Sequence, residues 1–114
     1  MASDFGFVEY VCDQLGAAGL ITHRKMFGEY AIYCEGKVVA LVVGNQLYIK
    51  PTNATQALYG DGPRGMPFPG AKPWFLVQER IDDHVWLCEL VKATEAALPE
   101  PKVRRPRQRA RRTP

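Results

Sequence analysis

Residues 24–50, RKMFGEYAIYCEGKVVALVVGNQLYIK, contain the pattern that decides the fold. Within them, residues 38–43 (VVALVV) form the most continuously apolar run of the chain and are rich in β-branched side chains, which is typical of a strand covered on one or both faces. The turn-forming dipeptide EG precedes this run and GN follows it, and β-prone residues 30–34 and 47–49 lie beyond the two turns. Because loops this short cannot hold a crossover, we predict three neighbouring antiparallel strands, a β-meander.

The segment before the meander predicts a helix and one further strand. Apolar residues at helical spacing indicate a helix over residues 4–17, with Ser3 or Asp4 as its cap. Residues 21–27 then predict a short strand, which Gly28 joins to the meander through a turn or a bulge.

A second, short helix is predicted to open at Pro51-Thr52, directly after the meander. Its inner side is expected to consist of three apolar residues, Ala54, Ala57 and Leu58. The glycine- and proline-rich residues 60–73 break this helix and allow at most a brief edge strand over residues 66–68.

Residues 74–78, WFLVQ, predict the last strand, and a final helix follows through about residue 97. Asp82 or Asp83 is its expected cap, where a carboxylate also complements the positive end of the helix dipole, and Pro99 stops the helix. The expected apolar side of this helix comprises Val85, Leu87, Cys88, Leu90, Val91, Thr94 and Leu98.

The predicted order is therefore helix, three or four strands, helix, one or two strands, helix. Strands grouped between helices and joined by hairpin turns predict an α+β fold with two layers, in which helices flank an antiparallel meander sheet. We expect one domain over residues 1–98 and a separate tail over residues 99–114. A chain of 114 residues can bury a core without disulfide bonds or a metal.

Composition narrows the class of protein. Cys12, Cys34 and Cys88 are scattered and form no CxxC pair, which argues against a disulfide framework or a zinc site and favours the reducing cytoplasm. No apolar run approaches about 18 residues, so we expect no membrane span. The glycine-rich residues 60–65, GDGPRG, lack the ending of a phosphate-binding loop and are interpreted as a simple loop, so no cofactor is predicted.

Charge is divided between the domain and the tail. Residues 99–114 carry seven of the fifteen basic side chains and one of the twelve acidic ones. Residues 1–98 therefore hold eight basic and eleven acidic groups, a net charge of −3, and the overall charge of +3 comes from the tail.

The proline-spaced, arginine-rich tail is predicted to be disordered, because it has almost no apolar residues. Its cations could bind nucleic acid through phosphates, with an affinity that is independent of sequence and falls steeply with salt. The alternatives are a solubilising end without a ligand, or contact with an acidic protein or a membrane surface. The candidate nucleic-acid-binding residues are Lys102, Arg104, Arg105, Arg107, Arg109, Arg111 and Arg112.

The central stretch also resembles a known family, the N-terminal domain of the TfoX/Sxy proteins. The residues that carry the resemblance are Arg24, Lys25, Met26, Phe27, Gly28, Tyr30, Ile32, Tyr33 and Gly36, with Met66-Pro67-Phe68 before the last strand. The resemblance covers about residues 5–98 and implies an α+β fold similar to that of secretion chaperones. The best-known members are bacterial regulators of natural competence that act with a cyclic-AMP receptor protein at promoters. Those members carry a second, helical domain where this chain has its basic tail.

The motif residues allow two interpretations. Arg24 and Lys25 could face a partner at the mouth of the sheet. Alternatively the motif is structural, with Met26 and Phe27 in the core and Gly28 in a turn that needs its backbone freedom. We favour the structural interpretation.

No catalytic or metal-binding constellation is predicted. A nucleophile dyad of His23 and Cys34 would lie on adjacent strands, but it lacks an orienting third group, and we expect Cys34 in the core. His84 is the second histidine and has no set of neighbouring ligands in sequence. Asp82 and Asp83 are interpreted as helix-capping residues rather than as a catalytic pair.

The resemblance implies a non-enzymatic regulatory or adaptor domain, involved in transcription regulation, and we expect it to contact a protein partner through the sheet or the last helix. Trp74, Phe75 and Trp86 could belong to the core or to an interface, and a homodimer stays open. One alternative is a ligand-binding or enzymatic domain with a pocket between sheet and helices. Its residues would be His23, Arg24, Tyr33 or Tyr48. The other alternative is a chaperone-like dimer that binds a partner.

Overall fold

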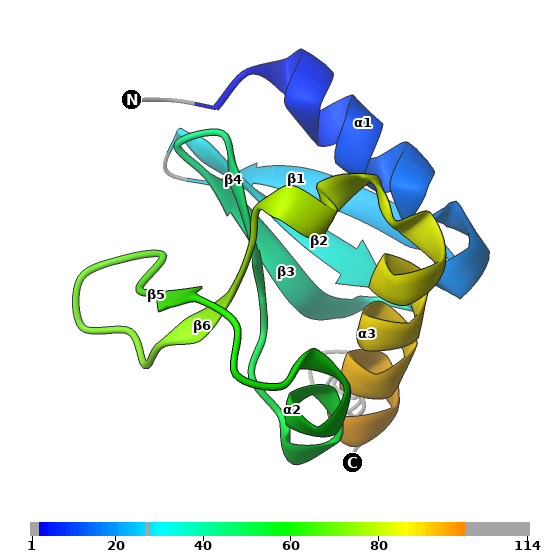
Figure 1. The fold of residues 1–114 in the computed structure, drawn as a ribbon. Coiled ribbons are helices and arrows are strands. Elements are labelled where there is room, and N and C mark those ends of the chain that lie inside the picture. The colour runs from blue at the N-terminus through cyan, green and yellow to red at the C-terminus, as the bar shows by residue number, and fades with distance from the viewer. Residues whose placement is uncertain (1–2, 27, 100–114) are drawn as a thin grey trace, which may run out of the picture.

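The fold is seen in a computed structural model that describes residues 3–26 and 28–99. Its elements in chain order are α1 (Phe5–Gln14), a 3₁₀ turn η1 (Gly16–Ala18), β1 (Ile21–Met26), β2 (Glu29–Cys34), β3 (Lys37–Val43), β4 (Gln46–Ile49), α2 (Asn53–Tyr59), β5 (Arg64–Gly65), β6 (Trp74–Val77), a 3₁₀ turn η2 (Glu79–Asp82) and α3 (His84–Ala97). The six strands form one antiparallel sheet in the order β1-β2-β3-β4-β6-β5 (Figure 1). The α+β fold with a meander sheet is confirmed.

The two meander turns form where their sequence predicted them. Glu35 and Gly36 between β2 and β3, and Gly44 and Asn45 between β3 and β4, all have positive φ values, from 53° to 81°. Two successive residues with positive φ make the turn whose twist matches that of antiparallel strands. These short turns hold β2, β3 and β4 side by side, with one register shift between Ile32 and Tyr33.

The helices cover a single face of the sheet, so the domain has two layers (Figure 1). The core between the layers joins α1, α3 and the inward-facing strand residues, and burying this apolar surface provides most of the driving force for folding. Its fully buried members include Val8, Val11, Leu15, Ile32, Val42, Leu47, Ile49, Leu87, Leu90 and Val91.

The prediction for the inner side of α2 is wrong. Ala54, Ala57 and Leu58 are exposed, and the buried residue is Thr55. Thr52 caps the helix by accepting a hydrogen bond from the Thr55 N–H at 3.0 Å, and the Thr55 hydroxyl bonds to that of Thr94 on α3. The two helices therefore meet through a buried chain of hydroxyl groups, which a search for apolar spacing cannot find.

The edge strand was predicted two residues too late. Arg64 and Gly65 pair with Phe75 and Trp74, whereas Met66 and Phe68 are exposed and lie outside β5. Pairing ends just before Pro67, which has no N–H group to donate to a neighbouring strand.

Capping of the last helix by Asp83 is confirmed, because its carboxylate accepts a hydrogen bond from the Trp86 N–H at 3.1 Å. One residue of the predicted apolar side is wrong: Val85 is 61% exposed, since it lies in the first turn and faces solvent. Trp74 and Phe75 are buried, so they belong to the folded domain rather than to an exposed aromatic surface.

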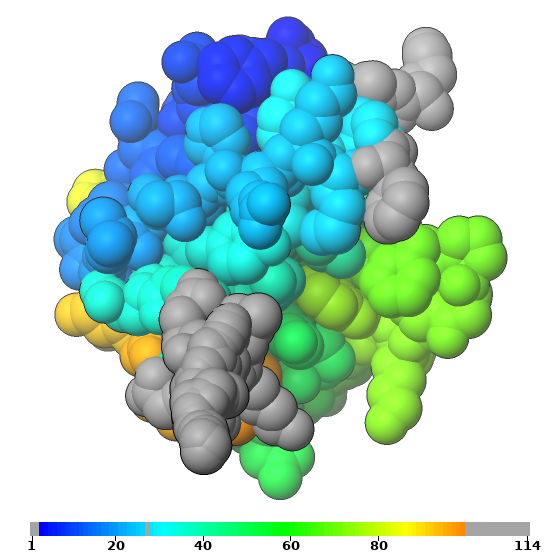
Figure 2. Space-filling model, turned by 180° about the vertical axis from the view of Figure 1, so that it is seen from behind, coloured from blue at the N-terminus to red at the C-terminus, as the bar shows by residue number. Residues whose placement is uncertain are grey.

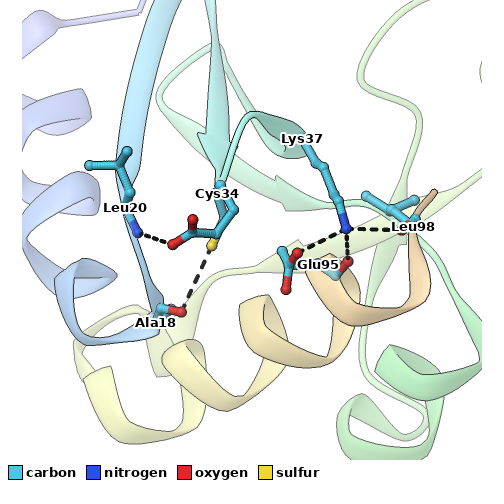
Figure 3. A network of polar contacts seen from close by, with 7 residues as sticks. Ala18, Leu20, Cys34, Lys37, Glu95 and Leu98 are labelled. Atoms are coloured by element: carbon cyan, nitrogen blue, oxygen red, sulfur yellow. Dashed lines mark hydrogen bonds and ion pairs between the residues drawn. The ribbon is translucent and has the colours of Figure 1, made fainter. Parts of the chain in front are cut away.

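The end of α3 is fastened to the β2–β3 turn by a buried lysine (Figure 3). The Lys37 ammonium lies 2.9 Å from a carboxylate oxygen of Glu95 and donates hydrogen bonds of 3.1 Å to the carbonyls of Glu95 and Leu98. A cation at the C-terminus of a helix pairs with carbonyls that have no partner within the helix. The predicted basic tail begins just past this point, and its candidate residues lie outside the described range.

Candidate docking surface on the open face of the sheet

The face of the sheet turned away from α1 and α3 is called the open face here. Viewed from behind, strand residues are in direct view on it, and none of the helices in the described part of the chain lies across it (Figure 2). Partners opposite each other in an antiparallel pair point to the same face, so the register assigns residues to this face.

One row of open-face residues crosses five strands. Arg24 pairs with Ala31, Ala31 with Leu41, Leu41 with Tyr48, and Tyr48 with Leu76. All but Arg24 are buried or half-buried, although none of the helices in the described part of the chain covers them. The row therefore presents an apolar band that ends in a cation at the β1 edge.

A groove of about 530 Å³ lies beside this band, between the end of β1, the start of β2, β3 and the loop before β6. It is lined by Met26, Glu29, Tyr30, Leu41, Val43, Pro67 and Phe68. Met26 is 37% exposed and Phe68 is 50% exposed, so a flexible methionine and an aromatic ring form an accessible rim of the groove. A concave apolar surface of this kind is typical of sites that take up a side chain of another molecule.

The single carboxylate of the groove is already engaged. Glu29 accepts hydrogen bonds from the N–H of Ser3 at 2.9 Å, from the Ser3 hydroxyl, and from the N–H of Gly44 at 3.3 Å. Glu29 thus ties the start of the chain to the β3–β4 turn. Because its oxygens have these partners, the groove offers mainly apolar surface to an incoming molecule.

Strand β1 forms the edge of the sheet next to the groove. Its residues after Ile21 are all exposed. None of the described residues pairs with the side chains of Arg24 or Lys25 through a hydrogen bond or an ion pair. The edge thus combines backbone groups with two cations that have no partner among the described residues.

A second hollow, of about 310 Å³, lies between β6, the loop after α2 and the start of α3. Trp86 lines it, with the guanidinium of Arg80 stacked 3.9 Å from the ring centroid and bonded to Asp83 at 2.8 Å. Tyr59 also lines it, and its hydroxyl is 2.6 Å from the carbonyls of Pro63 and Leu76. The polar groups here pair with the protein itself, so this hollow is the weaker candidate.

The pocket predicted between sheet and helices is not assembled from the expected residues. His23 and Arg24 are exposed on β1 and point to opposite faces, and Tyr48 is buried in the open-face row. Tyr33 is half-buried on β2 and lines neither hollow. The chain folds each of them into a separate environment because they alternate on strands rather than converge on a loop cluster.

The histidine and cysteine candidates are also apart. His23 stacks edge-on against Phe5 with ring centroids 5.5 Å apart, whereas Cys34 is fully buried and its thiol is directed to the Ala18 carbonyl at 3.8 Å (Figure 3). Burial raises the pKa of the Cys34 thiol, which disfavours the reactive thiolate. Within the described residues, no cluster of three or more histidine, cysteine or acidic side chains could hold a metal ion.

Comparison with known proteins places the chain among its relatives. A family model described as the TfoX N-terminal domain matches residues 13–98. The chain belongs to the TfoX N-terminal domain family. It is also 35% identical over 105 residues to an uncharacterised 12.7 kDa protein in the trpE 5' region of Spirochaeta aurantia, an alignment that covers 92% of this chain and 91% of that protein.

This TfoX N-terminal domain distributes its motif residues over the edge strand β1, the neighbouring strand β2 and the turns that flank β2. The expectation that Met26 lies in the core is wrong, since it faces the groove; Phe27 lies outside the described residues. Gly28 has a φ of 82°, as its predicted turn role requires, and Gly36 has a φ of 81° in the β2–β3 turn. The Tyr30 ring packs against Phe5 and His23.

Sequence reasoning missed most of the groove. Leu41, Val43 and Phe68 were assigned to strands and not to a site. One signal was present: the uniformly apolar run 38–43 indicated a strand apolar on both sides, and the described helices cover one of those sides. In the described part of this TfoX N-terminal domain, no helix is both long and apolar enough to cross a membrane.

Proposed function

We propose that this TfoX N-terminal domain is a non-enzymatic regulatory or adaptor domain that binds a protein partner through the open face. The observation that carries the proposal is the apolar groove of about 530 Å³ on the face that no described helix covers. Its occupant is an apolar side chain of the partner, because the groove volume suits one or two such side chains and its carboxylate is engaged.

The rim of the groove supports a protein partner. Met26 and Phe68 are exposed at the groove and Met66 is exposed two residues before Phe68, and methionine and aromatic side chains are enriched where proteins meet. Methionine adapts its shape to different partners, and phenylalanine contributes a large apolar area. Exposed residues of these types on a small domain cost solubility, which favours their use in binding.

The tail supplies the second part of the proposal. Seven cations between Lys102 and Arg112 would attract nucleic acid without sequence preference, which suits a domain that brings a partner to a promoter. The resemblance to competence regulators that work with a promoter-bound protein supports a role in transcription regulation.

Photo-crosslinking tests the open face. Phe68 is replaced by p-benzoylphenylalanine in the full chain, expressed in its native host, and the matched control carries the same group in place of Val85, which is exposed on α3. The expected result is one discrete protein adduct from position 68 that is absent from position 85. Adducts of equal yield at both positions, or none at position 68, would overturn the proposal.

A salt titration tests the tail. Duplex DNA is titrated with the full chain and with a variant in which the seven tail cations are replaced by glutamine. The full chain should bind with a slope of log K against log salt of up to roughly −6, and the variant should lose most of this dependence. Equal binding by both proteins would exclude the tail as the nucleic-acid anchor.

A further inference from the structure

We propose that β1 is a strand-addition site that takes up an extended, acidic segment of the protein partner. The inference rests on the proposed function, because it names the chemistry of that partner. It adds a second contact, formed by backbone groups of the edge strand, to the apolar contact in the groove.

The direction of the backbone groups on β1 follows from one hydrogen bond. The Glu35 N–H donates to the Leu20 carbonyl at 2.9 Å, just before β1 begins. In an antiparallel pair the bonded positions alternate, so Thr22, Arg24 and Met26 exchange bonds with β2 in the printed register. The N–H and C=O groups of His23 and Lys25 therefore point away from the sheet, where another strand can pair with them.

The length of β1 suits this role. It has six residues, which span about 20 Å and allow several backbone hydrogen bonds to an added strand. The opposite edge, β5, has two residues and ends before Pro67. The described sheet therefore has one edge long enough to accept a strand of useful length.

Side chains around β1 determine the chemistry of the added segment. Arg24 points to the open face and Lys25 to the helix face, and neither side chain has a partner among the described residues. Exposed apolar contacts are available on both faces. Met26 provides one on the open face, and Phe5, whose ring lies 5.5 Å from that of His23, provides the other on the helix face. A matching segment carries two adjacent acidic residues flanked by apolar ones, so that its carboxylates meet both cations.

The same charges disfavour the other occupants. Pairing β1 with β1 of a second copy would bring Arg24 and Lys25 of both chains to one seam, and cations at an edge are a known means of preventing such pairing. The basic tail of the same chain would be repelled in the same way. A nucleic-acid backbone could accept from the cations and the N–H groups, but it would leave the outward carbonyls of His23 and Lys25 without donors.

The test is an NMR titration of the ¹⁵N-labelled full chain with the peptide acetyl-Thr-Val-Glu-Glu-Val-Thr-Thr-amide. The expected result is shifts concentrated at the amides of residues 21–26, with none there from the same peptide carrying Lys-Lys in place of Glu-Glu. Replacing Arg24 and Lys25 by glutamate should weaken binding about tenfold or more, whereas Lys50→Glu with Lys72→Glu, an equal change of charge outside β1, should change it less than about twofold.

Three results would overturn the inference. They are shifts confined to residues beyond 99, equal shifts from both peptides, and larger shifts of residues 21–26 with duplex DNA than with the acidic peptide. Failure here is distinguishable from failure of the proposed function, because the crosslink at position 68 reports the groove and does not depend on β1. A crosslink without peptide binding would leave the adaptor function in place and exclude strand addition.

Discussion

The two faces of the sheet carry similarly apolar side chains, but they differ in how deeply these side chains are buried. On β3, Ala40 and Val42 point to the helices and are fully buried, whereas Leu41 and Val43 point to the open face and are half-buried. Side chains of α1 and α3 pack against the covered face, whereas the open face has a groove. The apolar residues that the core does not use therefore lie on the open face, where we propose that a partner binds.

Shortening one leucine on each face should change the free energy of unfolding by different amounts. Leu47→Ala on the covered face should lower the free energy of unfolding by about 2–5 kcal/mol, because a fully buried side chain is lost and a cavity is left. Leu41→Ala on the open face should cost about 1 kcal/mol, because the side chain is only partly buried and no helix of the described chain packs on it. Urea unfolding measures both. Equal losses would show that the open face is part of the core.

Lys37 provides the next test, on the covered side. Lys37→Met should cost about 1–3 kcal/mol, since the Glu95 carboxylate and two helix carbonyls lose their cation. Lys72→Met, at an exposed lysine in the loop before β6, is the matched control and should change stability by less than about 0.5 kcal/mol. Thermal unfolding of both variants measures this, and an unchanged melting temperature for Lys37→Met would contradict the fastening role.

Two threonine substitutions test whether buried hydroxyl groups matter more than exposed ones. Thr55→Val should cost about 1–2 kcal/mol, because the hydroxyl groups of Thr52 and Thr94 lose a partner in a buried place. Thr22→Val on the open face of β1 should be neutral or slightly stabilising, since valine favours strands and no buried bond is lost. The ranking would be refuted by a larger loss in Thr22→Val than in Thr55→Val under chemical denaturation.

The smallest effect is an acid-dependent one at the start of α3. The hydrogen bond from Arg80, followed by that from the Trp86 N–H, lowers the pKa of the Asp83 carboxyl below its ordinary value of 3.8. The pKa of Asp83 is therefore lower in the folded state than in the unfolded state. Its contribution to the free energy of unfolding is complete at pH values above the unfolded-state pKa and is lost as the pH falls toward the folded-state pKa.

Asp83→Asn tests this acid dependence, because asparagine keeps the cap without the charge. The difference in stability between pH 5 and pH 3 should be smaller in Asp83→Asn than in the natural chain, as measured by urea unfolding at each pH. An unchanged difference would show that other carboxylates account for acid sensitivity.

The sequence predicted the parts of the fold that depend on local chemistry. The meander turns follow from EG and GN, the start of α3 from an aspartate before an apolar helix, and the turn at Gly28 from its freedom to take positive φ. The wrong predictions concern residues whose burial depends on a part of the chain that is distant in sequence. Thr55 is buried because its hydroxyl bonds to that of Thr94 on α3. Met26 is exposed because no described helix lies over its face of the sheet.

The candidate site was harder to predict than the fold. The motif drew attention to Arg24 and Lys25, and the structure places both on the edge strand without described partners. The groove joins Met26 and Leu41 to Pro67 and Phe68, which are far apart in the chain. Proximity of this kind has no local signal, because it depends on how β6 and its preceding loop return to the sheet.

Turn residues, apolar periodicity and charge act over short distances, so the sequence alone determined the antiparallel order of the meander, the main helices and strands, and the separation of net negative charge in residues 1–98 from net positive charge in residues 99–114. Only the tertiary structure decided which face of the sheet the helices cover. A strand that is apolar on both sides carries no alternation to mark its inner face, so the choice depends on where α1 and α3 pack. That choice leaves the groove and the β1 edge accessible.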